Sequence, residues 1–235
     1  MAQPDHRVSE KARGGSFERM EQAIIAAAGD LFDRKGFNQT SLGDIADAVG
    51  VARSTLYHYF DNREQILVAG VDKLTTLRNA LRDSILAMEP DPLARLNRLM
   101  VGLGELVSAN PVWIRILMRD EAALPDDTRV RDRESRLGYF ELIADTLRDG
   151  TASGHFRARD EHATALTIVA ALSGLQGQLA AARVTHVDDT TQLIVDVLLR
   201  GVLDDQPRTG PPLERGLDLI LEGADLIRRA RESHG

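Results

Sequence analysis

The stretch SLGDIADAVGVARSTLYHYF, residues 41–60, is the part of the sequence that best indicates the fold. It begins with a Ser-x-x-Asp pattern at Ser41, which resembles a capping box with Asp in place of Glu. Apolar residues at helical spacing then predict a short helix that ends at Gly50. A second short helix is expected over about residues 53–60. Two short helices joined by a tight, glycine-containing turn form a helix-turn-helix pattern.

The second of these helices has two different faces when its residues are placed 100° apart. Leu56 and Phe60 point in one direction, which we expect to be the core. Eight residues span about 12 Å of helix, a length that fits the major groove of B-DNA. A plain solvent-exposed surface is an equally good explanation of a polar face on such a short helix. The outward face carries hydrogen-bonding residues with no acid among them: Ser54, Thr55, Tyr57 and His58.

The rest of the chain is predicted to be one helix after another. Residues 1–16 are polar and are expected to form a flexible arm, followed by a helix that ends near Gly36. Prolines separate the later segments, and no segment alternates β-branched and polar residues. We therefore predict an all-α fold. The later long helices are expected at about residues 126–150, 160–183, 187–203 and 213–231.

Composition excludes several classes of function. The 235 residues predict one or two domains, with 29 Lys and Arg against 36 Asp and Glu, a net charge of −7. Binding to nucleic acid must therefore come from a local surface. The absence of cysteine excludes disulfides, thiol catalysis and Cys-ligated zinc. No apolar stretch approaches about 18 residues and the N-terminus has no apolar signal region, so we expect a cytoplasmic protein with no membrane span.

Residues 25–67 resemble the TetR family of bacterial transcriptional regulators. The resemblance covers roughly residues 18–78, about a quarter of the chain. It implies a DNA-binding domain over residues 18–78, with the helix-turn-helix at 41–60. A larger helical domain for ligand binding and dimerisation is implied over residues 79–235. The matched elements, at fixed spacing, are Leu31-Phe32, Gly36-Phe37, Thr40-Ser41, Ile45-Ala46, Gly50-Val51, Thr55–Phe60 and Arg63-Glu64.

The resemblance also implies which residues touch DNA. Tyr57 matches a tyrosine that touches a phosphate, and Arg63 matches a basic residue that contacts the DNA backbone. Arg53 is best suited to guanine, because its fork can pair with O6 and N7. Two positions depart from the family: Gly43 replaces a long polar side chain found in some relatives, and Ala52 replaces a capping serine, at a cost of about 1 kcal/mol. The DNA-binding candidates are Ser41, Arg53, Ser54, Thr55, Tyr57, His58, Tyr59 and Arg63.

The second domain is implied to enclose an effector pocket. Its candidate residues are large apolar side chains on three consecutive helices, although core packing is the more common role for any single one of them. Arg115 either faces a carboxylate or lies on the surface. The helices at about 160–183 and 187–203 have broad apolar faces, which the resemblance assigns to a homodimer interface. The effector-binding candidates are Met100, Leu103, Trp113, Met118, Tyr139 and Phe140.

The sequence thus predicts a homodimeric DNA-binding regulator, a repressor that binds a palindromic operator and is released by a small molecule. A ligand-independent regulator or activator of the same fold is one alternative. A helical small-molecule-binding protein or enzyme without DNA binding is another. No catalytic residue, cofactor or metal is predicted. The His and acidic residues near His155 and His186 are better explained as caps and surface, because no His-Glu-x-x-His spacing is present.

Overall fold

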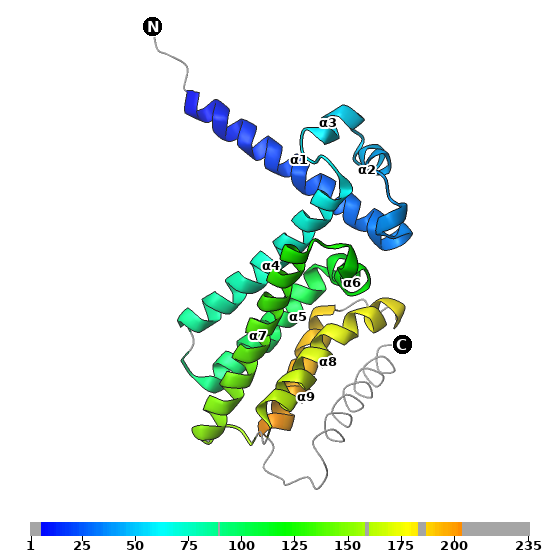
Figure 1. Ribbon diagram of the computed structural model, residues 1–235. Helices are drawn as coiled ribbons and strands as arrows, with labels where there is room; N and C mark the ends of the chain where they lie inside the picture. The colour runs from blue at the N-terminus through cyan, green and yellow to red at the C-terminus, as the bar shows by residue number, and fades with distance from the viewer. Residues whose placement is uncertain (1–5, 89, 158–159, 183–186, 204–235) are drawn as a thin grey trace. The chain divides into compact units, whose positions relative to one another are not determined.

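The computed structural model describes residues 6–88, 90–157, 160–182 and 187–203, and all regular structure in these ranges is helical (Figure 1). The prediction of an all-α fold is confirmed. The predicted helix 213–231 lies outside the described residues. The helices are α1 (His6–Lys35), η1 (Phe37–Gln39), α2 (Leu42–Val49), α3 (Arg53–Tyr57), α4 (Arg63–Met88), α5 (Pro92–Ala109), α6 (Pro111–Asp120), η2 (Glu121–Ala123), α7 (Asp126–Ala152), α8 (Glu161–Ala182) and α9 (Val187–Leu203).

The chain divides into two compact units. Of the described residues, the first unit contains those up to Leu74 together with Val112–Asp132, and the second contains those of Thr75–Pro111 and those from Arg133 to Leu203. The sequence places the domain boundary between residues 78 and 79. The structure differs in assigning α6 and the first turns of α7 to the first unit. The physical reason is that α6 forms an ion pair, backbone hydrogen bonds and packing contacts with α1, described below.

Helix α1 is longer at its start than the sequence predicts. Residues 6–16, expected to form a flexible arm, are helical and continuous with the rest of α1. Good helix formers such as Glu10 and Lys11 favour this extension, whereas Gly14 and Gly15 each disfavour it by about 1 kcal/mol relative to alanine. Extending an existing helix fixes one residue for each new hydrogen bond, so the extension avoids the cost of nucleation.

Helix α2 begins with the capping box that the sequence predicts. The Ser41 hydroxyl accepts a hydrogen bond from the Asp44 amide at 3.1 Å, and Asp44 accepts one from the Ser41 amide at 2.8 Å. Hydrogen bonds from Ser41, and then one from Lys35, lower the pKa of Asp44 to about 2. The helix ends at Gly50, whose φ of 77° lies in the left-handed region that favours glycine.

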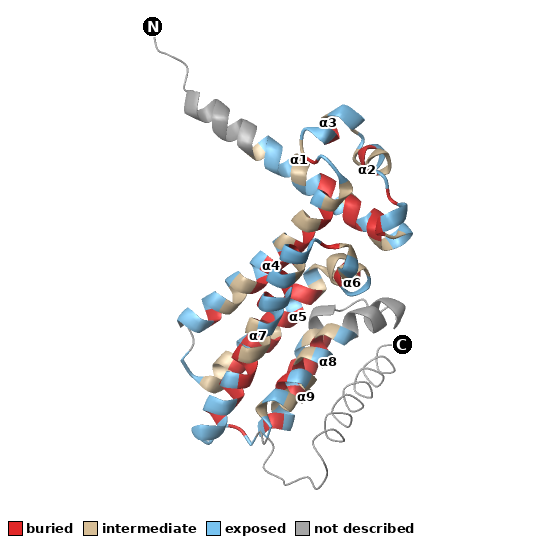
Figure 2. Ribbon diagram, viewed as in Figure 1, coloured by how far each residue is buried: buried red, intermediate tan, exposed pale blue. Residues whose placement is uncertain are grey.

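The core of the first unit lies between α1, α2, α3 and the start of α4. In Figure 1, α2 and α3 lie beside α1, and Figure 2 shows that their buried residues face inward. This packing holds the two short helices in place, since neither is long enough to be stable alone. The fully buried side chains of this core include Ile24, Phe32, Ile45, Leu56, Ile66 and Leu67.

In the second unit, α5 packs against both α8 and α9, and α8 and α9 each carry buried residues along their length (Figure 2). Part of the apolar surface predicted for a dimer is therefore used within the chain: Ala165, Leu172 and Leu198 are buried. Leu166 on α8 is different, because 61% of its surface is exposed. The second unit thus leaves some of the predicted dimer face uncovered.

Candidate nucleic-acid interface

Helix α3 has the two faces that the sequence predicts. Leu56 is completely buried and Phe60 nearly so, whereas Tyr57 is 50% exposed. Ser54 and His58 are also exposed, and Thr55 is half-buried. The helix itself is shorter than predicted, because it ends at Tyr57 and His58 forms its C-cap. Its outer surface therefore consists of polar side chains that are held in place by two buried anchors.

The start of α3 is stabilised by backbone bonds alone. Ala52 is the N-cap and provides no side-chain hydrogen bond, as the sequence predicts. The Ala52 carbonyl accepts from the amide of Thr55 at 2.9 Å and from that of Leu56 at 3.2 Å. Because a capping side chain is missing, the position of α3 depends mainly on the burial of Leu56.

Tyr59 lies differently from the other candidate residues. It is half-buried, and its ring stacks on Phe17 of α1 with centroids 4.5 Å apart and an angle of 24° between the planes. Aromatic pairs in this arrangement contribute about 0.5–1.5 kcal/mol beyond their area burial. Tyr59 therefore attaches the end of the helix-turn-helix to α1, a role that its place in the sequence did not indicate.

Arg63, the first residue of α4, makes several contacts within the first unit. Its Nη1 donates to the carbonyls of Asn38 at 2.9 Å and Thr40 at 3.2 Å, and its guanidinium lies 4.7 Å from the ring centroid of Phe37. Its Nε donates to Glu64 at 3.4 Å. Within the described residues, nothing accepts from Nη2. Arg63 thus holds the segment before α2 and keeps one donor available.

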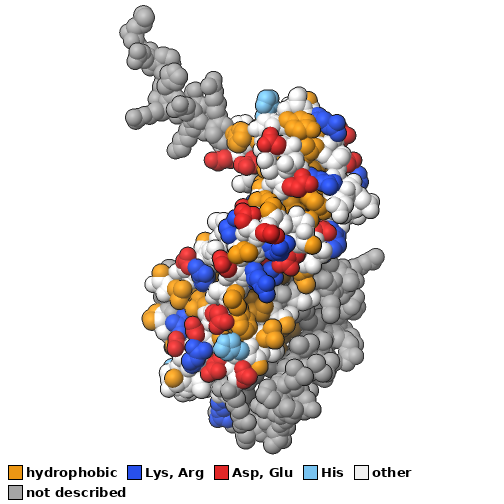
Figure 3. All heavy atoms as spheres, in the orientation of Figure 1, with side chains coloured by type: hydrophobic (Ala, Val, Ile, Leu, Met, Phe, Trp, Pro, Cys, Tyr) orange, Lys and Arg blue, Asp and Glu red, His pale blue; other side chains and the backbone are white. Residues whose placement is uncertain are grey.

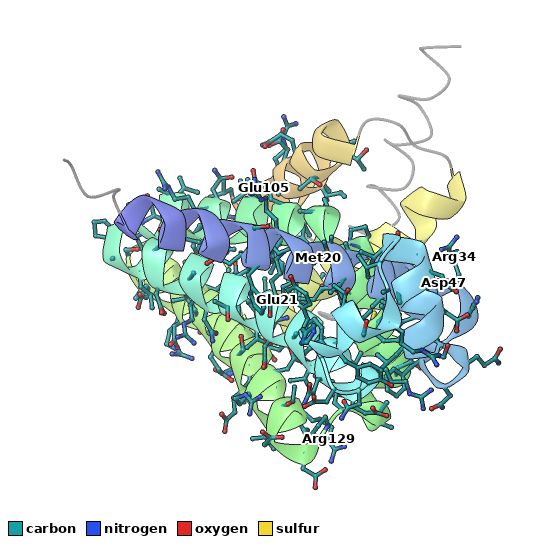
Figure 4. All side chains as sticks on the ribbon, turned by 90° about the horizontal axis from the view of Figure 1, so that it is seen from above. Met20, Glu21, Arg34, Asp47, Glu105 and Arg129 are labelled. Carbon is teal, nitrogen blue, oxygen red and sulfur yellow. The ribbon has the colours of Figure 1, made fainter. Side chains whose placement is uncertain are left out.

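Arg53 is exposed and forms no hydrogen bond or ion pair with any described residue. Lys35, by contrast, forms an ion pair with Asp44 at 3.2 Å. On the face seen in Figure 3, basic and acidic side chains are intermixed, in agreement with the net charge of −7. Arg34 and Asp47, at the end of the first unit where α1 meets α2, show the same mixture (Figure 4). Charge that could bind DNA is therefore concentrated in single side chains.

Helix α6 is attached to α1 by two arginines. Arg115 donates to both carboxylate oxygens of Asp33, at 3.1 and 2.6 Å, and this contact lowers the pKa of Asp33. Arg119 donates to the backbone carbonyls of Phe32 at 2.6 Å and Asp33 at 3.1 Å. Cations near the last carbonyls of a helix also interact favourably with its dipole. Arg115 therefore faces a carboxylate, and that carboxylate belongs to the protein itself.

Trp113 also belongs to the first unit. A methyl group added at Gly29 of α1 would lie 3.2 Å from the indole ring, and one added at Gly70 of α4 would overlap it. The indole is also in edge-to-face contact with Phe32, at 6.5 Å between centroids. Two glycines therefore make room for this tryptophan, a relation that the sequence alone could not show because the three residues are far apart in the chain.

The structure does not bring the six effector-binding candidates together. Met100, Leu103 and Tyr139 are buried in the second unit, where the Tyr139 hydroxyl donates to the Leu99 carbonyl at 2.7 Å. Burial raises the pKa of Tyr139. Trp113 packs in the first unit, and Met118 is 77% exposed there. Phe140 is half-buried, and the centroid of its ring lies 5.9 Å from that of the His162 ring.

One buried polar pair in the second unit was missed by the sequence reasoning. Arg78 on α4 is almost fully buried and donates to the hydroxyl of Ser135 on α7 at 3.2 Å. That hydroxyl donates to Asn79 at 2.7 Å. Arginine is rarely buried unless it is paired, so the sequence gives no sign of this arrangement. In the parts of the chain that the structure describes, no helix could span a membrane and no three His, Asp or Glu residues gather as a metal site.

A short recognition helix with an exposed polar face, followed by a helical second unit, defines a helix-turn-helix regulator. Comparisons with known proteins agree. Residues 24–69 match the family "Bacterial regulatory proteins, tetR family", and residues 89–202 match "Tetracyclin repressor-like, C-terminal domain". The chain therefore belongs to the TetR family and is a DNA-binding transcriptional regulator.

Individual relatives support this assignment. The HTH-type transcriptional repressor KstR2 of Rhodococcus jostii (strain RHA1) is 32% identical over 152 residues, which cover 62% of this chain and 71% of the relative. KstR2 of Mycolicibacterium smegmatis is 27% identical, and that match covers 57% of this chain and 66% of the relative's length. AibR, solved in complex with isovaleryl coenzyme A and operator DNA, has a similar fold, with a TM-score of 0.64, 22% identity and coverage of 78% of this chain and 98% of AibR.

Proposed function

We propose that this protein represses transcription as a homodimer that places α3 of each protomer in the major groove of a palindromic operator. The observation that supports the proposal best is the outer face of α3. Its residues Arg53, Ser54, Tyr57 and His58 are exposed, include no acid, and are held from behind by the buried Leu56. Hydrogen-bonding side chains on the outer face of a short, exposed helix suit the edges of bases in the major groove.

The candidate residues divide into two roles. We assign Tyr57 and Arg63 to phosphates, since Tyr57 is half-exposed and Arg63 keeps its Nη2 available. Arg53, Ser54 and His58 are assigned to base edges, with Thr55 beside them. Ser41 is a weaker phosphate candidate, because Asp44 already accepts from both its amide and its hydroxyl. Phosphate contacts fix the position of the protein, whereas base contacts provide sequence preference.

The homodimer is assigned to α8 and α9. Leu166 on α8 is largely exposed although its neighbour Ala165 is buried, which leaves apolar surface for a second copy of the chain. Two recognition helices in such a dimer must enter major grooves one turn apart, or a multiple of it, so their separation should be about 34–36 Å or a multiple. The remaining apolar residues proposed for this surface, such as Leu175 and Leu179, lie outside the residues whose side chains are described.

The effector is assigned to the second unit, near Met100, Leu103 and Tyr139 on α5 and α7. These side chains provide an apolar environment with one hydroxyl, and Arg78 adds a buried positive charge on α4. A ligand that favours the non-binding form by about 1.4 kcal/mol reduces operator affinity tenfold. Isovaleryl coenzyme A is a suitable first probe because AibR, which has a similar fold, was solved with it.

Selection of binding sites from random DNA tests the proposal. We expect a palindromic consensus, bound by two chains per site in light-scattering measurements of the complex. A consensus without two-fold symmetry, or one chain per site, would contradict the dimeric arrangement. Failure to enrich any sequence would contradict sequence-specific recognition by α3. Expression from a reporter that carries the consensus should fall when the protein is present, and a rise would identify an activator.

A further inference from the structure

Gly43, on the first turn of α2, lies directly beneath the guanidinium of Arg53 on α3. A methyl group built on Gly43 would be 3.1 Å from Cζ and 3.4 Å from Nε of Arg53, and it would overlap Nη2. Three atoms of one guanidinium therefore occupy the space that any side chain at position 43 would need. No other residue type can leave that space empty, because every other one carries a Cβ.

The position of Gly43 is well defined by its neighbours. It lies between Ser41 and Asp44, whose capping-box hydrogen bonds of 2.8 and 3.1 Å fix the first turn of α2. Ile45 and Ala46 in the next turn are buried in the core of the first unit. The helix backbone at Gly43 is thus a rigid surface, and the guanidinium of Arg53 rests on it.

Arg53 itself is available for a partner outside the chain. It is exposed, and no described residue accepts a hydrogen bond from it or forms an ion pair with it. A guanidinium has five donors in a planar fork, which match the two acceptors O6 and N7 on the major-groove edge of guanine. A side chain that rests on a fixed surface loses less conformational entropy when it binds.

We propose that Gly43 is a specificity-determining residue of this regulator: its bare backbone positions the Arg53 guanidinium for one guanine of the operator. The inference rests on the proposed function, since it needs α3 in the major groove. The role of Gly43 is indirect, through Arg53, because glycine has no side chain to offer a base. Substitution at position 43 should therefore change base preference at the position that Arg53 reads, and at no other.

The substitution Gly43→Ala should move Arg53 and leave the fold intact. The overlapping atom is the end of a long, flexible side chain, which can rotate away from the new methyl group. Alanine is also a better helix former than glycine, so the thermal midpoint should stay the same or rise. Gly15→Ala is the matched control, because a methyl group at helical Gly15 meets no atom within 4 Å.

The experiment uses the full-length protein and its selected operator, in which each base pair is changed in turn. Affinities of the wild type, Gly43→Ala, Arg53→Ala, Arg53→Lys and the Gly43→Ala/Arg53→Ala double variant are measured by fluorescence anisotropy. A bidentate arginine–guanine pair discriminates by about 1–3 kcal/mol, so Arg53→Ala should lose about 5- to 150-fold of preference at one base pair. Arg53→Lys should lose it too, because lysine lacks the fork.

Gly43→Ala should reduce preference at that same base pair by about threefold or more, with binding to random DNA unchanged. In the Arg53→Ala background it should have no further effect, because both substitutions act on one contact. Four results would each overturn the inference. Gly43→Ala could weaken binding equally on every sequence, leave the base preference unchanged or fail to fold. The fourth is that the effects of Gly43→Ala and Arg53→Ala on that preference are fully additive. If the wild type enriches no operator, the proposed function fails first, and this result is distinct from all of the others.

Discussion

The helix-turn-helix and the second unit present their candidate residues in opposite ways. On α3 the polar residues are exposed, and apolar Leu56 behind them is completely buried. In the second unit the candidates Met100 and Tyr139 are themselves buried. Exposure and polarity distinguish a surface that a macromolecule can reach from the core behind it, whereas a small-molecule site inside a helical bundle has the same composition as the core.

The neighbours Leu56 and Tyr57 give the strongest test of this contrast. Leu56→Ala should lower the free energy of unfolding by about 2–5 kcal/mol, because it leaves a cavity where a fully buried side chain was. Tyr57→Ala should change it by less than about 0.5 kcal/mol, because that residue is half-exposed. It should instead weaken operator binding about tenfold, on the order of 1.4 kcal/mol. Chemical denaturation and anisotropy titrations of both variants measure the two effects, and equal loss of stability would contradict the assignment of faces.

Substitution of Arg63 should reduce both the stability of the protein and its affinity for DNA. Arg63→Ala removes both carbonyl contacts of Nη1, which should cost about 1 kcal/mol of stability. If Nη2 also contacts a phosphate, the slope of log affinity against log salt should fall by about 1 for each protomer. The measurement is a salt series on specific and random DNA. A loss of stability with an unchanged slope would show that Arg63 only positions the segment before α2.

The ion pair between Asp33 and Arg115 should make stability depend on pH. Arg115 lowers the folded-state pKa of Asp33. The stabilisation of the fold by this ion pair is therefore fully present above the ordinary aspartate pKa of about 3.9. It is then lost as the pH falls through the lowered value. The pair is partly exposed, so its contribution should be at most about 1 kcal/mol.

The comparison of wild type with Asp33→Asn at pH 7 and pH 3 checks this sign. The difference in thermal midpoint should be present at pH 7 and should shrink at pH 3. Asp30→Asn is the control, because Asp30 is an exposed aspartate on the same helix whose carboxylate pairs with no described residue. A difference that grows as the pH falls would contradict the ion-pair explanation.

An effect of similar size is expected at Tyr139 in the second unit. Tyr139→Phe removes the hydrogen bond to the Leu99 carbonyl while keeping the buried ring, so it should cost about 1 kcal/mol of stability. Operator affinity should stay within twofold, since Tyr139 lies in the second unit. If the effector binds beside this hydroxyl, its affinity should also fall, which a calorimetric titration with isovaleryl coenzyme A can detect. A change in operator affinity without effector would contradict the separation of roles.

Most of the predictions that the structure confirms depend on local sequence patterns. The capping box at Ser41, the glycine at the end of α2 and the faces of α3 all depend on residues a few positions apart. The contacts that the sequence missed join distant positions: Trp113 with Gly29 and Gly70, and Arg115 with Asp33. Neither the periodicity nor the composition of the sequence can predict that a glycine leaves room for a side chain from a distant part of the chain.

The contact between Gly43 and Arg53 shows the same limit at short range. Ten residues separate them, and the sequence treats Gly43 only as a departure from the family. In the structure, the Arg53 guanidinium occupies the space that a side chain at position 43 would need. Departures of this kind are informative once the neighbouring side chains are known.

The outer face of α3 is proposed to recognise a specific DNA sequence. A fluorescence-anisotropy titration of the wild type and Tyr57→Ala against DNA from upstream of the protein's own gene, with random DNA as competitor, tests it most directly. If that DNA does not bind, the consensus from random selection replaces it in the same titration. We expect nanomolar binding by the wild type that survives the competitor, and about tenfold weaker binding by the Tyr57→Ala variant, whose stability should be unchanged. Two results would contradict this recognition. One is that random competitor DNA abolishes binding to the selected consensus, and the other is that the wild type and Tyr57→Ala bind it equally well.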